Sequence, residues 1–205
     1  MGLSAEQLGE ALAALGRIEP RIAKVVADLG QPEPRIRPRG YETLLRTIVG
    51  QQVSVKAAAA VWNKLEAARG DLTNPDSVLS ASFDELRACG LSRQKQGYAR
   101  SLGELVKSGE LDLHNLPEDD EEAIALLTQV KGIGRWSAEI YLLFAEGRLD
   151  IWPAGDLAIQ IAVGRILGLE ARPTEKETRL LAESWRPHRG AAAILAWHEY
   201  NISAI

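Results

Sequence analysis

The chain has 205 residues, of which 46% are hydrophobic and 25% charged, as in a globular protein large enough to bury a core. No apolar run approaches the ~20 residues of a membrane span, and the charged N-terminal segment does not resemble a signal peptide. The single cysteine, Cys89, excludes an internal disulfide and a four-cysteine metal site. A net charge of −4 argues against a nucleic-acid partner unless positive charge gathers on one face.

The first half of the chain predicts helices separated by short breaks. Apolar residues at helical spacing indicate a helix over residues 5–29 that Pro20 divides in two, and three prolines make residues 31–40 an extended linker. The next helices are expected at 41–49, at 54–68 with Ser54 as N-cap, in short pieces within 78–88 capped by Ser80 and Ser82, and at 93–108 after the break Gly90-Leu91-Ser92.

The second half continues the helical pattern. An acidic first turn leads into a helix over 121–130, and further helices are expected from Arg135, after Asp156, and at 174–183 and 190–200. No convincing strand pattern, repeat or low-complexity segment interrupts them. The expected fold class is therefore all-α.

The turn Val130-Lys131-Gly132-Ile133-Gly134 joins two of these helices. Its glycines let the backbone turn sharply and leave amide N–H groups uncovered at the start of the next helix, where the helix dipole favours an anion such as a phosphate. Such a hairpin is suited to hold a sugar–phosphate backbone without reading bases. Asp156, at the head of the third helix, would lie close to the nucleotide that this backbone presents.

These residues resemble a known family. Val-Lys-Gly-Ile-Gly-Arg-Trp-Ser-Ala at 130–138, followed by Trp-Pro-Ala-Gly-Asp at 152–156, is similar to the helix–hairpin–helix (HhH-GPD) DNA glycosylases with their Gly/Pro-Asp loop. The Gly-Ile-Gly-Arg-Trp spelling is closest to their 3-methyladenine DNA glycosylase II branch. Ile-Val-Gly-Gln-Gln-Val-Ser at 48–54 and Trp-Arg-Pro-His-Arg at 185–189 with Trp197 agree with that branch, so the resemblance spans residues 40–200.

The resemblance implies one HhH-GPD domain over residues 1–205, built as two helical lobes with a cleft for DNA and a flipped base between them. One lobe is expected at 40–153, with the hairpin at 127–140, and the other at 1–39 plus 154–205. The chain resembles a compact form without the N-terminal β domain of bacterial relatives. One cysteine is too few for the iron–sulfur cluster that the endonuclease III and adenine-mismatch branches usually carry.

Asp156 matches the family's catalytic aspartate. Breaking a base–sugar bond develops positive charge on the sugar, which a carboxylate stabilises while it orients or deprotonates water. The alternative is a plain helix N-cap, and one residue can serve both purposes. The preceding residue is Gly155, where relatives often carry Asp.

Aromatic residues match the family's base pocket. Bifunctional relatives carry a nucleophilic lysine at the position of Trp136, and Lys131 does not match it, so the resemblance implies a monofunctional enzyme without lyase activity. Trp136 and Trp197 match positions that stack on a cationic alkylated purine, with core packing as the alternative. Ile140 stands where relatives carry a tyrosine, and the neighbouring Tyr141 would point about 100° away around the helix.

The resemblance also places DNA contacts. Gln52 matches the wedge that fills the hole left by a flipped base, and Gln51 beside it is a candidate structural hydrogen-bonding residue. Ser92 and Lys95 are either phosphate contacts or a helix cap and a solvated side chain. The hairpin residues expected at DNA are Lys131, Gly132, Gly134, Arg135 and Ser137, and positive charge near that side would come from Arg93, Lys95, Lys131, Arg135, Arg186 and Arg189.

Backbone carbonyls of Thr128, Val130 and Ile133 match those that hold Na⁺ or K⁺ in the family's hairpin, with an ordinary turn and water as the alternative. No cofactor is expected to be required, and His114, His188 and His198 lack metal-ligand spacing.

The expected protein is a monofunctional DNA-3-methyladenine glycosylase that flips alkylated purines out of double-stranded DNA and leaves an abasic site. It is expected to be monomeric and intracellular, in the cytoplasm or nucleoid if bacterial, and without a membrane partner. The alternatives are a glycosylase of this fold for a deaminated or oxidised base, and a non-catalytic DNA-binding protein.

Overall fold

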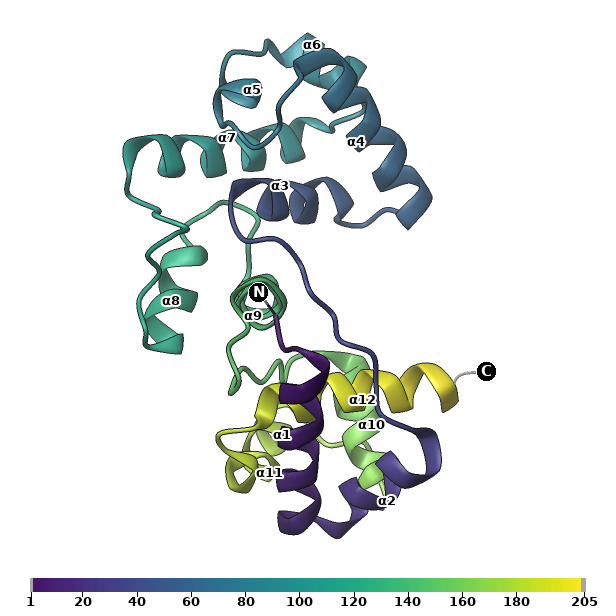
Figure 1. Ribbon diagram of the computed structural model, residues 1–205. Helices are drawn as coiled ribbons and strands as arrows, with labels where there is room; N and C mark the ends of the chain where they lie inside the picture. The colour runs from purple at the N-terminus through teal and green to yellow at the C-terminus, as the bar shows by residue number, and fades with distance from the viewer. Residues whose placement is uncertain (1, 204–205) are drawn as a thin grey trace. The chain divides into compact units, whose positions relative to one another are not determined.

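A computed structural model describes residues 2–203 and contains helices but no strand in that range, as the sequence predicts (Figure 1). Contacts divide the chain into a central unit, Pro38–Tyr141, and a terminal unit, Met1–Arg37 with Leu142–Ile205. None of the helices within 2–203 combines the length and apolar character needed to cross a bilayer.

The division differs from the expected lobes at its second boundary, which lies at Tyr141/Leu142 instead of after residue 153. The reason is that residues 142–153 pack within the terminal unit. Phe144 stacks against Trp197 with ring centroids 5.6 Å apart, and the Trp152 indole donates to the Thr178 carbonyl at 3.0 Å. Phe144 and Trp152 are both buried.

The central unit contains seven helices among the residues described. α3 packs against α4, α7 and α9, and its buried side chains Leu44, Leu45 and Ile48 form the middle of the unit's core. The helices are α3 (Tyr41–Gly50), α4 (Val55–Arg69), α5 (Asp76–Leu79), α6 (Phe83–Ala88), α7 (Arg93–Ser108), α8 (Asp120–Leu127) and α9 (Arg135–Tyr141).

Side chains start most of these helices. Ser54, Ser82 and Ser92 accept from backbone N–H groups at the starts of α4, α6 and α7, as predicted. Ser80, in contrast, ends α5, because its hydroxyl donates back to the Asp76 carbonyl at 2.6 Å. Ser80 is therefore a cap, as predicted, at the C-terminal end of α5.

The terminal unit joins the two ends of the chain. α1 packs on α2 and α10 packs on α12 (Figure 1). Its elements are α1 (Ala5–Ile18), α2 (Pro20–Leu29), a π-helical turn (Leu142–Glu146), α10 (Leu157–Ile166), α11 (Glu175–Leu181), a 3-10 turn (Glu183–Trp185) and α12 (Arg189–Ser203). Pro20 begins α2, so the predicted break in the first helix is confirmed.

Candidate functional site

The hairpin between α8 and α9 turns on Gly132. This residue has φ +84°, and a Cβ there would overlap the Tyr98 ring, so both the backbone and the packing require glycine. Its carbonyl accepts from Gln51 Nε2 at 2.7 Å, and the neighbouring Lys131 N–H donates to Ser101 Oγ at 3.1 Å. The turn is thereby tied to α7 and to the loop after α3.

Gly134 is different. Its φ is not positive, and a Cβ there would meet no atom within 4 Å. The sharp turn therefore depends on Gly132 and not on both glycines. No contact among residues 2–203 requires a glycine at this position. Gly134 comes directly before α9, where the first amide N–H groups have no partner within the helix. Because the fold of the hairpin does not require glycine at 134, the missing side chain there is suited to the close approach of the backbone of a binding partner.

The hairpin carbonyls stay a predicted cation site. Val130 O accepts from the Ile133 N–H at 3.0 Å, which leaves one of its two acceptor sites for another partner. Within residues 2–203, no group of three or more His, Cys, Asp or Glu side chains is placed to hold a metal ion.

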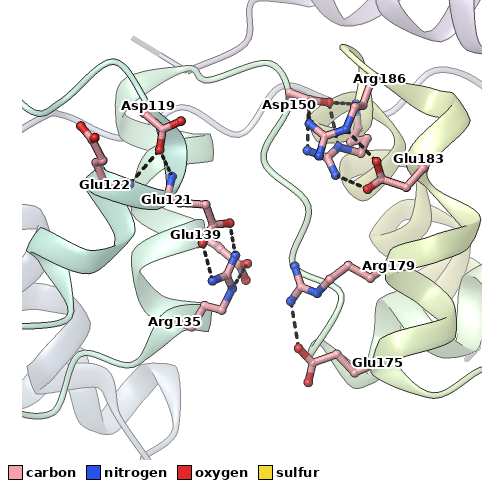
Figure 2. Close-up of polar contacts among 11 residues, drawn as sticks. Asp119, Glu121, Glu122, Arg135, Glu139, Asp150, Glu175, Arg179, Glu183 and Arg186 are labelled. Carbon is pink, nitrogen blue, oxygen red and sulfur yellow. Dashed lines mark hydrogen bonds and ion pairs between the residues drawn. The ribbon is translucent and has the colours of Figure 1, made fainter.

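Arg135, expected at DNA, is engaged by two carboxylates. Figure 2 shows its guanidinium donating to both Glu121 oxygens, at 2.8 and 2.5 Å, and to Glu139 Oε1 at 2.9 Å. The hydrogen bonds to Glu121 raise the pKa of Arg135 further above its ordinary value. Because Glu139 is only 3% exposed, the pair compensates a buried charge, and Arg135 adds little positive potential to the surface.

Other basic side chains expected near DNA also form ion pairs within the protein. In the terminal unit, Arg186 binds Asp150 (Figure 2). Arg189 binds the same carboxylate with two parallel bonds of 2.8 Å. Both arginines also pair with Glu183. Of the six basic residues expected on that side, Arg93 and Lys131 are exposed and form no ion pair within residues 2–203.

The loop between α3 and α4 presents the predicted wedge. Gln52 is exposed and has φ +55°, the one positive φ of a non-glycine residue among those described. Such a conformation is costly and tends to occur at functional positions. The loop base is held on both sides, by Gln51 on Gly132 O and by Lys95 Nζ, which donates to Val49 O at 2.7 Å. Burial lowers the pKa of Lys95.

Ser92 and Lys95 were each predicted with two alternatives, and the structure shows contacts within the protein at both, while the phosphate contacts stay a prediction. Ser92 is an N-cap, and the ammonium of Lys95 is bonded within the central unit and not simply solvated. Lys95 retains two further donors, and the first turn of α7 retains its dipole.

Asp156 is the N-cap of α10. Its Oδ1 accepts from the N–H groups of Ala158 at 2.9 Å and Ile159 at 3.1 Å, which fixes the carboxylate at the positive end of the helix. The loop before it is rigid, because Trp152 is buried and Gln160 Nε2 donates to Ala154 O at 2.9 Å. The cap is confirmed, and the catalytic role stays a prediction that this geometry permits.

The carboxylate of Glu175 lies beside Gly155. A Cβ at this position would lie 3.4 Å from Glu175 Oε2, in ordinary contact, and Arg179 holds the other oxygen of Glu175 at 2.8 Å. A carboxylate therefore borders Gly155 even though the residue itself carries none. An aspartate at 155 would place two like charges together here.

The predicted pocket aromatics differ in exposure. Trp136, on α9, is 47% exposed, whereas Trp197, on α12, is 8% exposed. Trp197 contacts the Phe144 ring, and the Arg35 Cζ is 5.8 Å from its centroid. Ile140 is buried. Tyr141 is also buried, and its hydroxyl accepts from the Gly40 N–H at 2.8 Å, so this side chain has a structural role.

The predicted site residues thus form two groups. The central unit brings together the wedge loop with Gln51 and Gln52, the helix start at Ser92 and Lys95, and the hairpin from Thr128 through Ser137. Asp156 and Trp197 belong to the terminal unit.

A model of the HhH-GPD superfamily of base excision DNA repair proteins matches residues 45–187. The chain belongs to this superfamily. DNA-3-methyladenine glycosylase 1 of Schizosaccharomyces pombe is 32% identical over 187 residues, which cover 89% of this chain and 82% of that protein.

Solved HhH-GPD structures agree. The DNA-3-methyladenine glycosidase of Bacillus halodurans superimposes with a TM-score of 0.85 at 29% identity, covering 96% of this chain and 90% of that one. The 3-methyladenine DNA glycosylase of S. pombe in complex with abasic DNA gives a TM-score of 0.77 at 30% identity, covering 96% and 97%. This chain therefore has the all-α HhH-GPD fold.

Proposed function

We propose that this chain is a monofunctional DNA-3-methyladenine glycosylase that acts in base excision repair inside the cell, as a monomer. The observation that carries the proposal is Asp156, a carboxylate fixed at the N-terminus of α10 in a chain whose relatives are named for this activity.

The hairpin, where Gly134 has no side chain, is the proposed contact for the DNA backbone, and Na⁺ or K⁺ bound to the hairpin carbonyls would strengthen that contact. Exchange of KCl for tetramethylammonium chloride, which should weaken DNA binding, tests that cation.

The chemistry needs one carboxylate and one water. The bond between the sugar C1′ and the base nitrogen breaks, and its electron pair leaves with the cationic alkylated purine, which becomes neutral. Asp156 stabilises the positive charge left on the sugar and takes a proton from the water that bonds to C1′. Trp136 offers no amine, so no Schiff base forms and an abasic site remains.

Base release from methylated duplex DNA tests the function. Under single turnover, chromatography should show 3-methyladenine released from methylated duplex and no base released from unmethylated duplex. Borohydride should trap no covalent complex, because there is no amine nucleophile. Release of a deaminated or oxidised base instead would assign the same fold to another lesion, and intact binding without any release would support a non-catalytic DNA-binding protein.

Replacing Gln52 with glycine should separate folding from base flipping. Glycine accepts φ +55° without strain, so we expect the free energy of unfolding to stay equal or rise by up to about 1 kcal/mol. The wedge is lost, and we expect base release to slow about tenfold or more, since flipping costs a few kcal/mol. Urea unfolding and the fluorescence of 2-aminopurine at the flipped position measure the two effects.

Val55→Ala is the matched control, because Val55 is 89% exposed and begins α4 just after the same loop. It should change neither quantity. A wild-type rate of release by Gln52→Gly would remove Gln52 from the wedge position.

A further inference from the structure

A groove of about 550 Å³ lies in the central unit, between α6 and the start of α7. Phe83, Asp84 and Arg87 of α6 form one wall, and Ser92, Arg93 and Gln96 form the other. The walls face each other because α6 ends after Ala88 and the chain turns at once into α7, with Leu91 buried beneath. Its volume is in the range of sites for small ligands.

One wall carries an exposed aromatic ring. Phe83 is 56% exposed, although large apolar side chains are more often covered. The guanidinium of Arg100 lies 4.7 Å from the ring centroid and is itself fixed by the carbonyls of Leu79 and Ala81. The ring is therefore held in place from inside the protein, and it offers a prepared surface for stacking.

Two arginines give the groove a net positive charge. Neither Arg87 nor Arg93 forms an ion pair or a side-chain hydrogen bond within residues 2–203, in contrast to Arg135, Arg186 and Arg189. Asp84 is the one acidic side chain that lines the groove. Ser92 adds the positive end of α7, a helix of 16 residues. Together these groups select an anion.

A buried amide at the groove lacks one partner. Gln96 is 2% exposed and donates through Nε2 to the Leu91 carbonyl at 2.9 Å, but its Oε1 accepts no hydrogen bond within the part of the chain described. A buried acceptor without a donor is unfavourable. Oε1 has almost no exposed surface, so a ligand N–H group satisfies it only when the Gln96 side chain turns toward the groove.

We propose that this groove binds an unpaired nucleotide of DNA. The base stacks on Phe83 and donates an N–H to Gln96, while its phosphate lies between Arg87, Arg93 and the start of α7. An aromatic ring beside basic groups is the usual way to hold single-stranded nucleic acid. An acidic peptide would use the arginines but not the ring and the amide together, so the nucleotide fits better. The inference depends on DNA as the partner and not on base excision.

Binding of short oligonucleotides to the full chain tests the inference. Fluorescence anisotropy with labelled octadeoxyadenylate should show binding that Phe83→Leu weakens about tenfold, since the apolar volume stays but the stacking is lost. Arg93→Gln should weaken it about fivefold and Asp84→Asn should tighten it about twofold, each by changing the charge at the groove. An abasic oligomer of the same length should bind more weakly and should not respond to Phe83→Leu.

Arg17→Gln is the control for net charge, because Arg17 is exposed on α1 in the other unit and loses the same charge as Arg93→Gln. It should bind as the wild type does, and circular dichroism should show each variant folded. Wild-type affinity in both Phe83→Leu and Arg93→Gln, equal binding of the abasic oligomer, or competition by octaglutamate at equal concentration would overturn the inference. Base release by the same wild-type preparation is scored separately, so failure of the proposed function is distinguished from failure of the groove.

Discussion

Replacing Asp156 with asparagine should slow single-turnover base release by about 10²- to 10³-fold while leaving the free energy of unfolding within about 0.5 kcal/mol. Asparagine caps a helix as well as aspartate does, and its Oδ1 can keep both bonds to Ala158 and Ile159. The negative charge that would face the sugar is lost. Quench-flow release of 3-methyladenine and urea unfolding measure the two quantities on one preparation.

The chain supplies a matched control for this change. Asp119 caps α8 with two bonds of 2.9 Å to Glu121 and Glu122 (Figure 2), so Asp119→Asn makes the same chemical change at another helix start and should leave the rate unchanged. Asp156→Ala should in addition lose about 0.5–2 kcal/mol of stability with its cap. A normal rate in Asp156→Asn would reduce Asp156 to a cap.

Local chemistry made most of the fold predictable. The bounds of α7, the break at Pro20 and the caps at Ser54 and Ser82 all depend on residues within one helical turn. Asp156 was recognisable as a cap for the same reason, since the apolar residues that follow it begin a helix. Ser80 was also recognisable as a cap, but not the end of the helix that it caps, because a hydroxyl next to a short helix can bond forward or backward.

Contacts between distant residues were not predictable in this way. The assignment of residues 142–153 to the first lobe missed Trp152, whose partner Thr178 lies 26 residues further on. The same holds for Arg135, counted as positive charge for DNA, because no local pattern shows that Glu121 would bind it. Gln51 on Gly132 O and Glu175 beside Gly155 also depend on segments far apart in the chain. A count of charges therefore overstated the positive surface near the hairpin.

Alanine at the two glycines of the hairpin should change different quantities, stability at Gly132 and DNA affinity at Gly134. Gly132→Ala should lower the free energy of unfolding by about 2–4 kcal/mol, because the new methyl group would overlap the Tyr98 ring and φ +84° disfavours any side chain. Gly134→Ala should change it by about 0.5 kcal/mol or less, since its methyl group would meet no atom within 4 Å. It should raise the Kd for duplex DNA about tenfold or more, because the methyl group would stand where a phosphate approaches the amides.

Gly109→Ala separates the two causes of the Gly132 effect. Gly109 ends α7 with φ +80°, and a Cβ there would meet nothing within 4 Å, so this variant loses stability through its backbone alone, by about 1 kcal/mol. Urea unfolding and anisotropy with a fluorescent duplex give stability and affinity for all three variants. Unchanged DNA affinity in Gly134→Ala would place the backbone contact elsewhere. Lost affinity at wild-type stability would mean that DNA binding requires the missing side chain at Gly134, whereas the fold requires it at Gly132.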